Sequence, residues 1–544
     1  MSKKFSELDR AVSLNNGDLL ALAQVDAEAE TGYKSAAAPV SDVAQKILKG
    51  ISFPADLETD SKNVLGAINE AAMDKNIANP YSNQATYDVG DFVIYQTVLY
   101  KCTTAVSVAE DFDDTKWEAT LVSNIDVDSE KAIEAYDTLN KFPSDVLWND
   151  NALFGKLKRT FNGITTDFDV SSLMPTQGKT YYVKPNGNDS NSGEDRDHPL
   201  QKLSTAIAKA DVQTIIVMDG IYNIGRVGGS FTKGINIIAD TNAHPIFIMS
   251  RDKTWSKTNG YNYIYETTDS ASTFYGVIKA DTRDSYGDLL SYSLAASLAD
   301  VEANENSYFV SGNTIYVHSA SSPQKLYVLV SGVNLHATLS NGDTLYVEGI
   351  EFIGGNYGGL RVTNGSSSKK PLVLVKNCGF SRSYMGNDFY LQGCSGIVQN
   401  CYASHAADDG FNYHATLNVI PDSIEIGCIG RFNGTVGNNT NNGSTTHDAA
   451  KILRLNCEFF GNIGPNIADV DNSKSFNYGV VSHDSAGSST NKTGIQCQNS
   501  IMYCDTCSAY NNGYNFQAYL GGVMYVKNCC GSLDIGSDGK ALAY

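Results

Sequence analysis

The sequence has little charge, and most of the charge it has is negative. Only 18% of its 544 residues are charged, and 60 acidic residues outnumber 40 lysines and arginines, which leaves a net charge of −20. Surfaces that bind nucleic acid are basic, so this balance argues against a nucleic-acid partner. It is compatible with neutral or mixed-charge polymers such as polysaccharides.

Long apolar runs are missing as well. No stretch reaches the roughly 20 apolar residues that a helix needs to cross a bilayer, so we predict no membrane partner. The opening residues MSKKFSELDR lead into polar sequence without the apolar segment of a signal peptide. We therefore expect a soluble chain that folds in the cytoplasm where it is made.

Motifs that would indicate a metal or a nucleophilic serine are weak or absent. The 11 cysteines contain one CxxC, Cys504 and Cys507, without the second CxxC of a zinc site. No GxSxG is present, which argues against a serine esterase. The stretch IADVDNS offers Asp469, Asp471 and Asn472 as oxygen ligands, but it lacks the glycine and final glutamate of an EF-hand loop. We predict no cofactor and no resident metal, and reduced, buried cysteines that act as small apolar side chains.

The length of the chain and its turn-forming residues indicate several, mainly β, domains. A chain of 544 residues is too long for one compact core. Its 48 glycines and 31 tyrosines favour strands joined by many turns. Residues 1–78 differ, because their apolar residues recur at near-helical spacing, and we expect a mostly helical leader there. Residues 122–165 are expected to be a helical connector with an apolar seam for partner chains.

Residues 79–121 are predicted to be a small β module. Phe92 and Ile94, and then Val98 and Tyr100, alternate as residues of short strands do. The module resembles small chitin-binding-type carbohydrate-binding modules in the order of Tyr87, Gly90, Asp91, Val93, Tyr100 and Trp117. The resemblance implies stacking of Trp or Tyr on sugar rings. The alternative is that these aromatic residues only fill a small core.

Residues 166–544 are predicted to be one long β domain. A strand and a turn rich in Gly, Asn and Asp come first. A helix over about 201–210 follows, and we expect it to cap the open end of stacked strands. Residues 245–340 are predicted to be a β-rich insertion, in which SGNTIYVH has Gly-Asn between apolar strands and indicates a hairpin. Trp255 either holds this insertion together or borders a glycan groove.

A repeat runs through the second half of the chain. Segments such as VLVKNCGF, IVQNCYAS and LRLNCEFF recur every 22 to 29 residues. Their equivalent positions are Ile350, Cys378, Cys401, Cys428, Cys457, Gly479, Cys504 and Cys529. One coil of a β-solenoid needs a similar number of residues, and stacked coils bury a common interior. Cysteine at one site of each coil therefore indicates a stack of small side chains that point inward.

Two segments carry a resemblance to known families. The opening of the β domain, with His198-Pro199-Leu200 before the expected helix, resembles right-handed parallel β-helix proteins of the pectate-lyase-like superfamily. The stretch TDSKNVLGAINEA resembles the N-terminal segments of bacteriophage tail fibres and tailspikes. The order of all segments resembles tailspikes that depolymerise polysaccharides. That resemblance implies a homotrimer, a place in the phage tail held by tail or baseplate proteins through residues 1–78, and capsule or O-antigen as substrate.

Acidic and histidine residues gather in four successive coils. The coil starts read GNDFYL, ADDGFNYH, THDAAKIL and GPNIADVD. Aligning them places Asp409, Asp448 and Asn466 in one column, and Asn412, Lys451 and Asp469 in the next. Parallel strands lie about 4.8 Å apart, so carboxyl groups one coil apart would be close together. The structural alternative is that Asp and Asn only bond the local backbone at turns.

Paired carboxyl groups suit the cleavage of a glycosidic bond, because one donates a proton while its ionised partner acts as base or nucleophile. The catalytic candidates are Asp409, Asp448, His447, His414, Asp469 and Asp471. The substrate-binding candidates are Asn412, Tyr413, Lys451, His483, Asp484 and Trp255. We favour hydrolysis by Asp409 and Asp448, assisted by His447 or His414.

Three other functions remain open at this point. A lyase would use a histidine or Tyr413 as base, with Lys451 or Arg454 neutralising a uronic acid carboxylate. A receptor-binding tail fibre would hold the glycan without cutting it. A secreted bacterial glycanase is disfavoured by the missing signal peptide and by the cysteines.

Overall fold

The computed structural model divides the chain into two compact units, Met1–Leu139 and Asn140–Tyr544. Each unit is described by itself. The residues that the structure describes are 19–25, 33–39, 79–95, 98–119, 157–160, 163–223, 229–251, 253–270, 273–331, 335–340, 342–366, 369–434, 441–488, 492–536 and 538–543. Among these residues, no helix is long and apolar enough to cross a membrane.

The first unit contains strands where helices were expected. Strands β1 (Leu19–Val25) and β2 (Tyr33–Pro39) pair as an antiparallel hairpin. Two segments within the expected helical leader are therefore strands, and the apolar spacing of β1 suits a strand as well as a helix. The rest of residues 1–78 lies outside the described residues.

The small β module is present and has an aromatic core. It contains β3 (Asn79–Pro80), β4 (Phe92–Tyr95), β5 (Val98–Cys102), the 3-10 helix η2 (Asp114–Lys116) and β6 (Trp117–Ala119). Trp117 is 5% exposed, and its ring lies 5.1 Å from that of Tyr87. A buried tryptophan cannot stack on a sugar, so this residue favours the core-filling alternative.

The first described residues of the second unit form a hairpin. Strands β7 (Leu157–Thr160) and β8 (Gly163–Thr166) are antiparallel and occupy the end of the expected helical connector. Residues 157–160 and 163–165 of the expected connector are therefore strands, and its other residues lie outside the described ones. The 3-10 helix η5 (Val170–Leu173) follows, and Val170 packs against the outer face of the solenoid.

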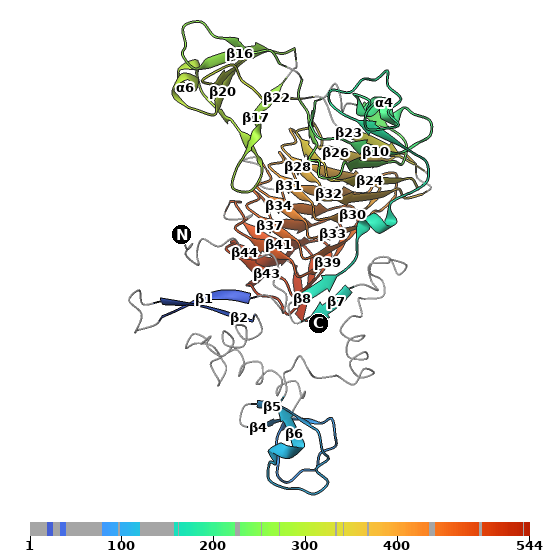
Figure 1. Ribbon diagram of the computed structural model, residues 1–544, viewed down its shortest axis with the longest axis vertical. Coiled ribbons are helices and arrows are strands. Elements are labelled where there is room, and N and C mark those ends of the chain that lie inside the picture. The colour runs from blue at the N-terminus through green and yellow to red at the C-terminus, as the bar shows by residue number, and fades with distance from the viewer. Residues whose placement is uncertain are drawn as a thin grey trace. The chain divides into compact units, whose positions relative to one another are not determined.

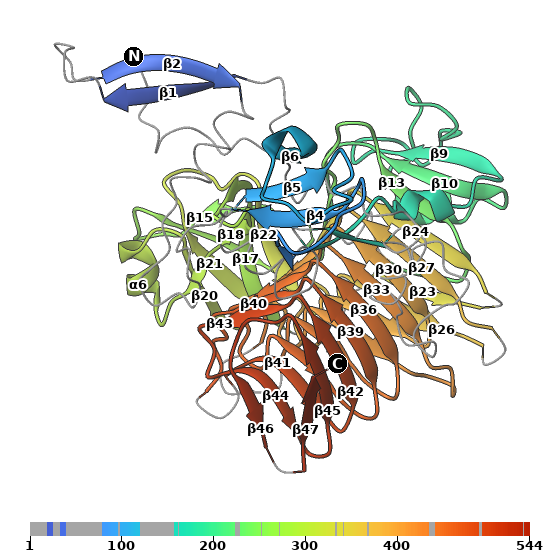
Figure 2. The same cartoon turned by 90° about the horizontal axis from the view of Figure 1, so that it is seen from below.

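A parallel β-solenoid makes up most of the second unit (Figure 1). A complete coil adds one strand to each of three parallel sheets, which frame a common interior (Figure 2). The twelve-stranded sheet contains β9 (Lys179–Val183), β10 (Val212–Val217), β13 (Asn236–Ala239), β24 (Thr344–Glu348), β27 (Leu372–Lys376), β30 (Ser395–Gln399), β33 (Asp422–Ile426), β36 (Lys451–Leu455), β39 (Lys474–Tyr478), β42 (Ile501–Asp505), β45 (Val523–Lys527) and β47 (Lys540–Ala543). The nine-stranded sheet contains β11 (Ile221–Tyr222), β14 (Ile246–Ile248), β25 (Glu351–Ile353), β28 (Gly379–Ser381), β31 (Tyr402–Ser404), β34 (Ile429–Arg431), β37 (Glu458–Phe460), β40 (Val481–His483) and β43 (Ser508–Tyr510). The ten-stranded sheet contains β12 (Gly229–Phe231), β23 (Leu335–Leu339), β26 (Leu360–Asn364), β29 (Phe389–Gln392), β32 (Phe411–His414), β35 (Ser444–Thr446), β38 (Ile467–Asp469), β41 (Thr493–Gln498), β44 (Tyr514–Tyr519) and β46 (Leu533–Ile535).

Tight turns connect the strands from β24 to β42 in the twelve-stranded sheet to the nine-stranded sheet. Asn377 and Asn400 have φ values of 52° and 54° there, a left-handed conformation that asparagine adopts more readily than most residues. The next residue of each coil points inward, which gives the column Ile350, Cys378, Cys401, Cys428, Cys457, Val480, Cys507 and Cys529. The predicted column is thus confirmed except at two coils, where Val480 replaces Gly479 and Cys507 replaces Cys504. The described cysteines are free, and all except Cys529 and Cys530 are buried, as predicted.

Both the cap and the insertion are present with shorter bounds than expected. The capping helix α4 spans Leu203–Ile207, inside the predicted 201–210. The insertion contains β15 (Ser256–Lys257), β16 (Ile264–Thr268), β17 (Phe274–Arg283), β18 (Leu289–Ser291), β19 (Ser293–Leu294), α6 (Leu298–Ala303), β20 (Ser307–Ser311), β21 (Thr314–His318) and β22 (Leu326–Val330). The predicted hairpin is confirmed as β20 and β21, which pair antiparallel around Gly312.

Candidate functional site

The outer face of the ten-stranded sheet carries a row of titratable side chains. In β32 the side chains of Phe411 and Tyr413 point into the solenoid, so the alternation of a strand turns Asn412 and His414 to the other face. The same alternation in β29 leaves Tyr390 half-buried on that face, beside His414 at 5.6 Å between ring centroids.

Two histidine–aspartate pairs lie side by side in this row. His414 Nδ1 is 2.9 Å from Asp448 Oδ2, and His447 Nδ1 is 3.5 Å from Asp471 Oδ2. The two imidazole rings stack at 4.1 Å between centroids, nearly parallel. Burial, and then the neighbouring His414, lower the pKa of His447. We call these four residues the histidine row.

Two carboxyl groups border the histidine row from the turn between β31 and β32. Asp409 is 4% exposed and accepts a hydrogen bond from the backbone N–H of Asn442 at 2.7 Å. Burial, and then the charge of Asp408, raise the pKa of Asp409 to about 8. Asp408 is half-buried, accepts a hydrogen bond from Asn441, and has a pKa raised by burial. A carboxyl group with a raised pKa stays protonated at a pH where ordinary carboxyl groups have lost the proton.

These carboxyl groups are near enough to the histidine row to interact with it electrostatically. The charge of His414 lowers the pKa of Asp408, against the larger effect of burial. Burial raises the pKa of Tyr390, Arg361 lowers it, and Asp448, Asp408 and then Asp409 raise it further. Tyr390 therefore lies within electrostatic reach of all three carboxyl groups.

Arg361 extends the site along the sheet. Its guanidinium lies 5.6 Å from the ring centroid of Tyr390 and 5.7 Å from that of Tyr357. It donates hydrogen bonds to Gln392 Oε1 from Nη2 at 2.6 Å and from Nε at 3.1 Å. The arrangement holds a cation between two aromatic rings on the face that also bears His414.

The alignment of the coils from sequence was wrong at this sheet. Asn412 pairs with Thr445, and Tyr413 pairs with Thr446, which in turn pairs with Asp469. The predicted columns Asp409–Asp448–Asn466 and Asn412–Lys451–Asp469 therefore do not exist. Lys451 begins β36 in the twelve-stranded sheet, where it pairs with Asp422 and Lys474. That position removes Lys451 from the site.

Two further candidates point into the solenoid. Asp469 is fully buried and accepts hydrogen bonds from both terminal nitrogens of Arg454, at 3.0 and 2.9 Å. Tyr413 is also fully buried, and Glu425 lies 3.6 Å from Arg454 in the same interior. A polymer cannot reach these groups, so their assignment to catalysis or substrate binding is corrected here. Because Asp469 points inward and Asp471 outward, the two do not form the cation site considered above.

The remaining candidates lie on other surfaces. His483 ends β40 in the nine-stranded sheet, and Asp484 follows it, so both belong to a different face from the histidine row. Trp255 packs against the apolar core of the insertion and also lines a cavity of about 350 Å³ there. It therefore holds the insertion together, which was one of the two alternatives for this residue.

Sequence reasoning missed four residues that the structure brings to these faces. Asp408, Tyr390 and Arg361 join the histidine row, and Glu458 contacts His483. The signal for Asp408 was its position beside Asp409, and alternation in FYLQ and LRVTN indicated Tyr390 and Arg361. No sequence signal singled out Glu458. Among the described residues, one group offers converging metal-ligand atoms, Asp284, Asp288 and His405, whose atoms lie within 4.8 Å.

Several solved structures align with roughly two thirds of this chain. The sequence matches no family model, and no curated protein matches it. A glycoside hydrolase structure aligns with 67% of this chain and 96% of its own, at 9% identity and a TM-score of 0.42. A rhamnogalacturonan lyase aligns with 64% and 73%, at 15% identity and a TM-score of 0.35. The Gp54 tailspike of Acinetobacter baumannii bacteriophage AP22, in complex with capsular saccharide, aligns with 61% and 67%, at 10% identity and a TM-score of 0.18. At identities of 9–15%, these alignments do not assign a chemistry to this chain.

Proposed function

We propose that the chain binds a host surface polysaccharide, capsule or O-antigen, and cuts it by hydrolysis of glycosidic bonds. One observation carries the proposal. A carboxyl group with a raised pKa, Asp408, and an exposed carboxylate held by a histidine, Asp448, lie around Tyr390 and His414 on one outer face. A stiff, unbranched solenoid offers such a site to an extended polymer from the side.

The two carboxyl groups have different roles in the reaction. Asp408 donates its proton to the glycosidic oxygen as the bond from that oxygen to the sugar carbon breaks. Asp448 takes a proton from the attacking water, or attacks the sugar carbon itself, and His414 fixes its orientation. Asp409 is a positioning residue, because it is buried and holds Asn442 and Asn412 beside Asp408.

Hydrolysis is favoured over elimination by the presence of two carboxyl groups, Asp408 and Asp448, which suit the roles of acid and of base or nucleophile. A lyase needs a cation to neutralise a uronic acid carboxylate, and of the cations considered, the two expected from the sequence are out of reach, which leaves Arg361 on this face. Arg454 is fully buried and paired with Asp469, while Lys451 lies in another sheet. A place in the phage tail as a homotrimer, attached through residues 1–78, is part of the proposal and rests on the order of the segments in the sequence.

The test is cleavage of a panel of purified capsules and O-antigens by the full chain, with released oligosaccharides identified by mass. We expect a reducing end without a double bond, and about a 10²–10⁴-fold lower rate for Asp408→Asn. The matched control is Asp195→Asn, an exposed acid paired with His198 on a turn near the cap. Unchanged cleavage by Asp408→Asn would refute the catalytic site, and binding without any shortening of the glycan would identify a receptor-binding fibre instead.

A further inference from the structure

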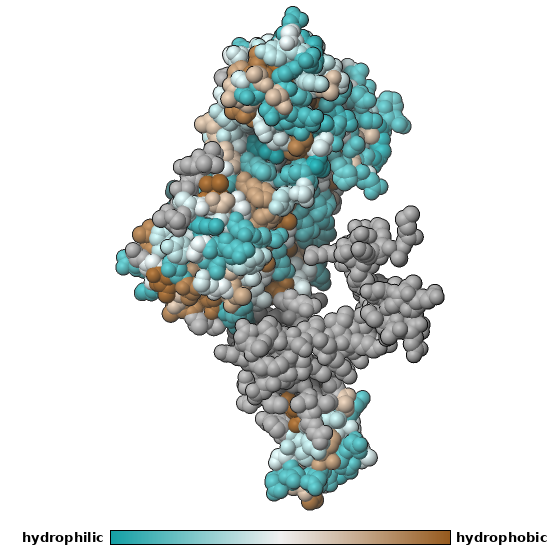
Figure 3. Space-filling model, turned by 90° about the vertical axis from the view of Figure 1, so that its left-hand side faces the viewer, coloured by the Kyte–Doolittle hydropathy of each residue, from teal (hydrophilic) through white to brown (hydrophobic). Residues whose placement is uncertain are grey.

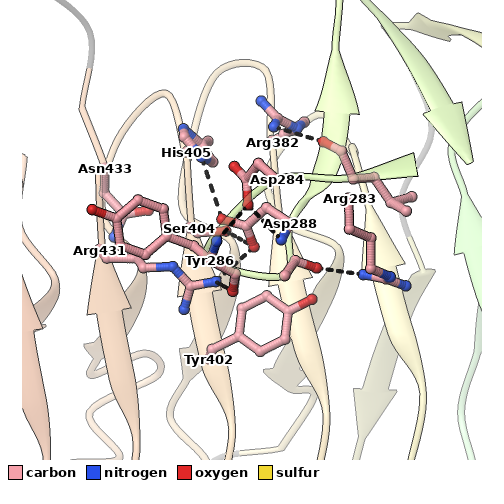
Figure 4. A network of polar contacts seen from close by, with 12 residues as sticks. Arg283, Asp284, Tyr286, Asp288, Arg382, Tyr402, Ser404, His405, Arg431 and Asn433 are labelled. Atoms are coloured by element: carbon pink, nitrogen blue, oxygen red, sulfur yellow. Dashed lines mark hydrogen bonds and ion pairs between the residues drawn. The ribbon is translucent and has the colours of Figure 1, made fainter. Parts of the chain in front are cut away.

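A loop of the insertion is fastened to the nine-stranded sheet. Residues 283–289 join β17 to β18 and reach over β28, β31 and β34 (Figure 4). Asp288, 1% exposed, accepts a hydrogen bond from Arg431 at 2.7 Å and another from Ser404 at 3.1 Å. Arg283 forms a close ion pair with Glu351 of β25. We call this loop the clasp.

The residues that contact the clasp have a backbone conformation that is unfavourable for large side chains. Arg382, His405 and Phe432 each follow a strand of the nine-stranded sheet with φ values of 65°, 61° and 57°. This left-handed region suits glycine or asparagine, and Gly461 occupies the equivalent place one coil later. The large side chains contact the clasp instead: Arg382 donates to the backbone oxygen of Leu289, and His405 lies 3.4 Å from Asp288.

The clasp forms one wall of a groove that continues along the nine-stranded sheet. Tyr286, 55% exposed, stands 4.8 Å from Phe432 between ring centroids. The groove has a volume of about 740 Å³, and its lining includes Tyr286, Phe432, Phe460, His483, Glu458 and Asp484. Phe460 and His483 stack at 4.9 Å, so aromatic surface runs from coil to coil. Figure 3 views the molecule from the side on which the insertion lies, and shows apolar surface exposed below it.

Polar groups in the groove are placed so that they can hydrogen-bond to the hydroxyl groups of a sugar. His483 contacts two carboxylates at once, Asp484 through Nδ1 at 2.7 Å and Glu458 through Nε2 at 3.1 Å. Both carboxylates are about half exposed, at 57% and 45% of the side chain, so they have oxygen atoms left for a ligand. Aromatic surface with a few fixed hydrogen-bonding groups is the usual composition of a site for a small polar ligand.

The charge of the groove decides which glycans fit. Its cation, Arg431, is neutralised by Asp288, since burial raises the pKa of Asp288 but His405 and Arg431 hold it below its usual value. The accessible charges are the two carboxylates, which repel a uronic acid. The same charge balance argues against a metal at Asp284, Asp288 and His405, because Arg431 already supplies the positive charge.

We propose that this groove is a second glycan-binding site, which takes a neutral or amino-sugar segment of the polymer on a different face from the histidine row. This inference rests on the proposed function for the presence of a glycan. The groove itself makes no contact with the catalytic residues. Its role is to hold the chain on the polymer while the histidine row cuts, so its ligand is bound and not transformed.

The test uses the full chain with Asp408→Asn, so that glycans stay intact. An array printed with neutral, amino-sugar-containing and uronate-rich bacterial surface oligosaccharides selects a probe, and calorimetry then measures its affinity and stoichiometry. Glu458→Gln and Asp484→Asn are each expected to weaken binding at least tenfold or to halve the stoichiometry. Asp195→Asn is the matched control, since Asp195 is an acid of similar exposure paired with a histidine.

The outcomes separate this proposal from the proposed function. Unchanged affinity and stoichiometry in both groove variants would overturn the second site, as would an array on which only uronate-rich glycans or none are bound. Thermal unfolding of each variant at the temperature of the parent chain shows that the fold is intact. Should Asp408→Asn leave cleavage unaffected, the catalytic assignment fails, and the groove variants are then compared on a bound oligosaccharide that the chain does not shorten.

Discussion

The same short segment of chain supplies one aspartate to the inside of the solenoid and one to the outside. Asp469 ends β38, points inward and is paired with Arg454, whereas Asp471 lies in the next turn with 60% of its side chain exposed. The residue types are alike. Alternation within a strand would put residues two apart on the same face, but β38 ends at Asp469, and Asp471 lies in the following turn with a left-handed φ of 55°. Whether an acidic side chain points into the solenoid or out to the surface therefore decides whether it stabilises the fold or can contact a ligand.

The loss of one member of the buried polar cluster around Arg454 should strongly destabilise the fold. Arg454 also donates a hydrogen bond to Ser444, and Ser444 donates to Glu425, whose pKa burial raises. Ion pairs without access to water lose their hydration, and the remaining partner suffers most when one member is removed. The exposed pairs of the histidine row keep their contact with water, so the same loss is small for them.

Replacement of the interior cation should have the largest effect. Arg454→Ala leaves Asp469 and Glu425 buried without their cation, so we expect a loss of about 3–5 kcal/mol in the free energy of unfolding. Urea unfolding followed by circular dichroism measures this. Lys451→Ala in the same strand is the control and should change stability by no more than about 0.5 kcal/mol. Equal effects of the two changes would contradict the distinction between inside and outside.

Replacement of the exposed carboxylate should instead affect the reaction. Asp448→Asn keeps a side chain that tolerates the φ of 56° at this position but removes the charge, so we expect kcat to fall about 10²–10³-fold. Unfolding should stay at the wild-type denaturant concentration. Release of oligosaccharides under saturating polymer measures kcat. A change in KM alone would make Asp448 a binding residue and remove it from the chemistry.

The fold could be predicted because its signal repeats. Cysteine at one site of each coil showed the solenoid, since a stack of small inward side chains recurs with every turn of the chain. Gly312-Asn313 between apolar strands showed the hairpin of β20 and β21. The short segments of the first unit gave no such repetition, so the spacing of β1 was compatible with a helix as well as a strand.

The site could be predicted only in part, because register decides it. His414, His447, Asp448 and Asp471 do come together, but Asp409 and Asp448 do not share a column. More residues separate β34 from β35 than separate β31 from β32, and an alignment based on similar residues does not detect this difference. A shift by one residue turns a side chain to the opposite face, which is how Asp469 was assigned to the outside.

The buried acid beside the site should give a smaller, pH-dependent effect. The pKa of Asp409 is about 8 in the folded chain, above the value of an unfolded aspartate. Its stabilising contribution is complete below the unfolded pKa and is lost as pH rises through the folded pKa. Wild type should therefore lose stability relative to Asp409→Asn as the pH rises from about 4 to about 8. Denaturant titrations at several pH values measure the difference, and parallel curves would contradict the raised pKa.

The smallest expected effect concerns the outer cation. Arg361 is held by two hydrogen bonds to Gln392 and by the rings of Tyr357 and Tyr390, and lysine reproduces the charge but not the planar contacts. Arg361→Lys should therefore raise KM about 3–10-fold, the equivalent of roughly 1 kcal/mol, with kcat unchanged because no bond breaks there. Lys369→Arg, on the connection between β26 and β27, is the control for a changed cation elsewhere. A fall in kcat would place Arg361 among the groups that act on the transition state, and an unaltered KM would confine the binding surface to the histidine row and its carboxyl groups.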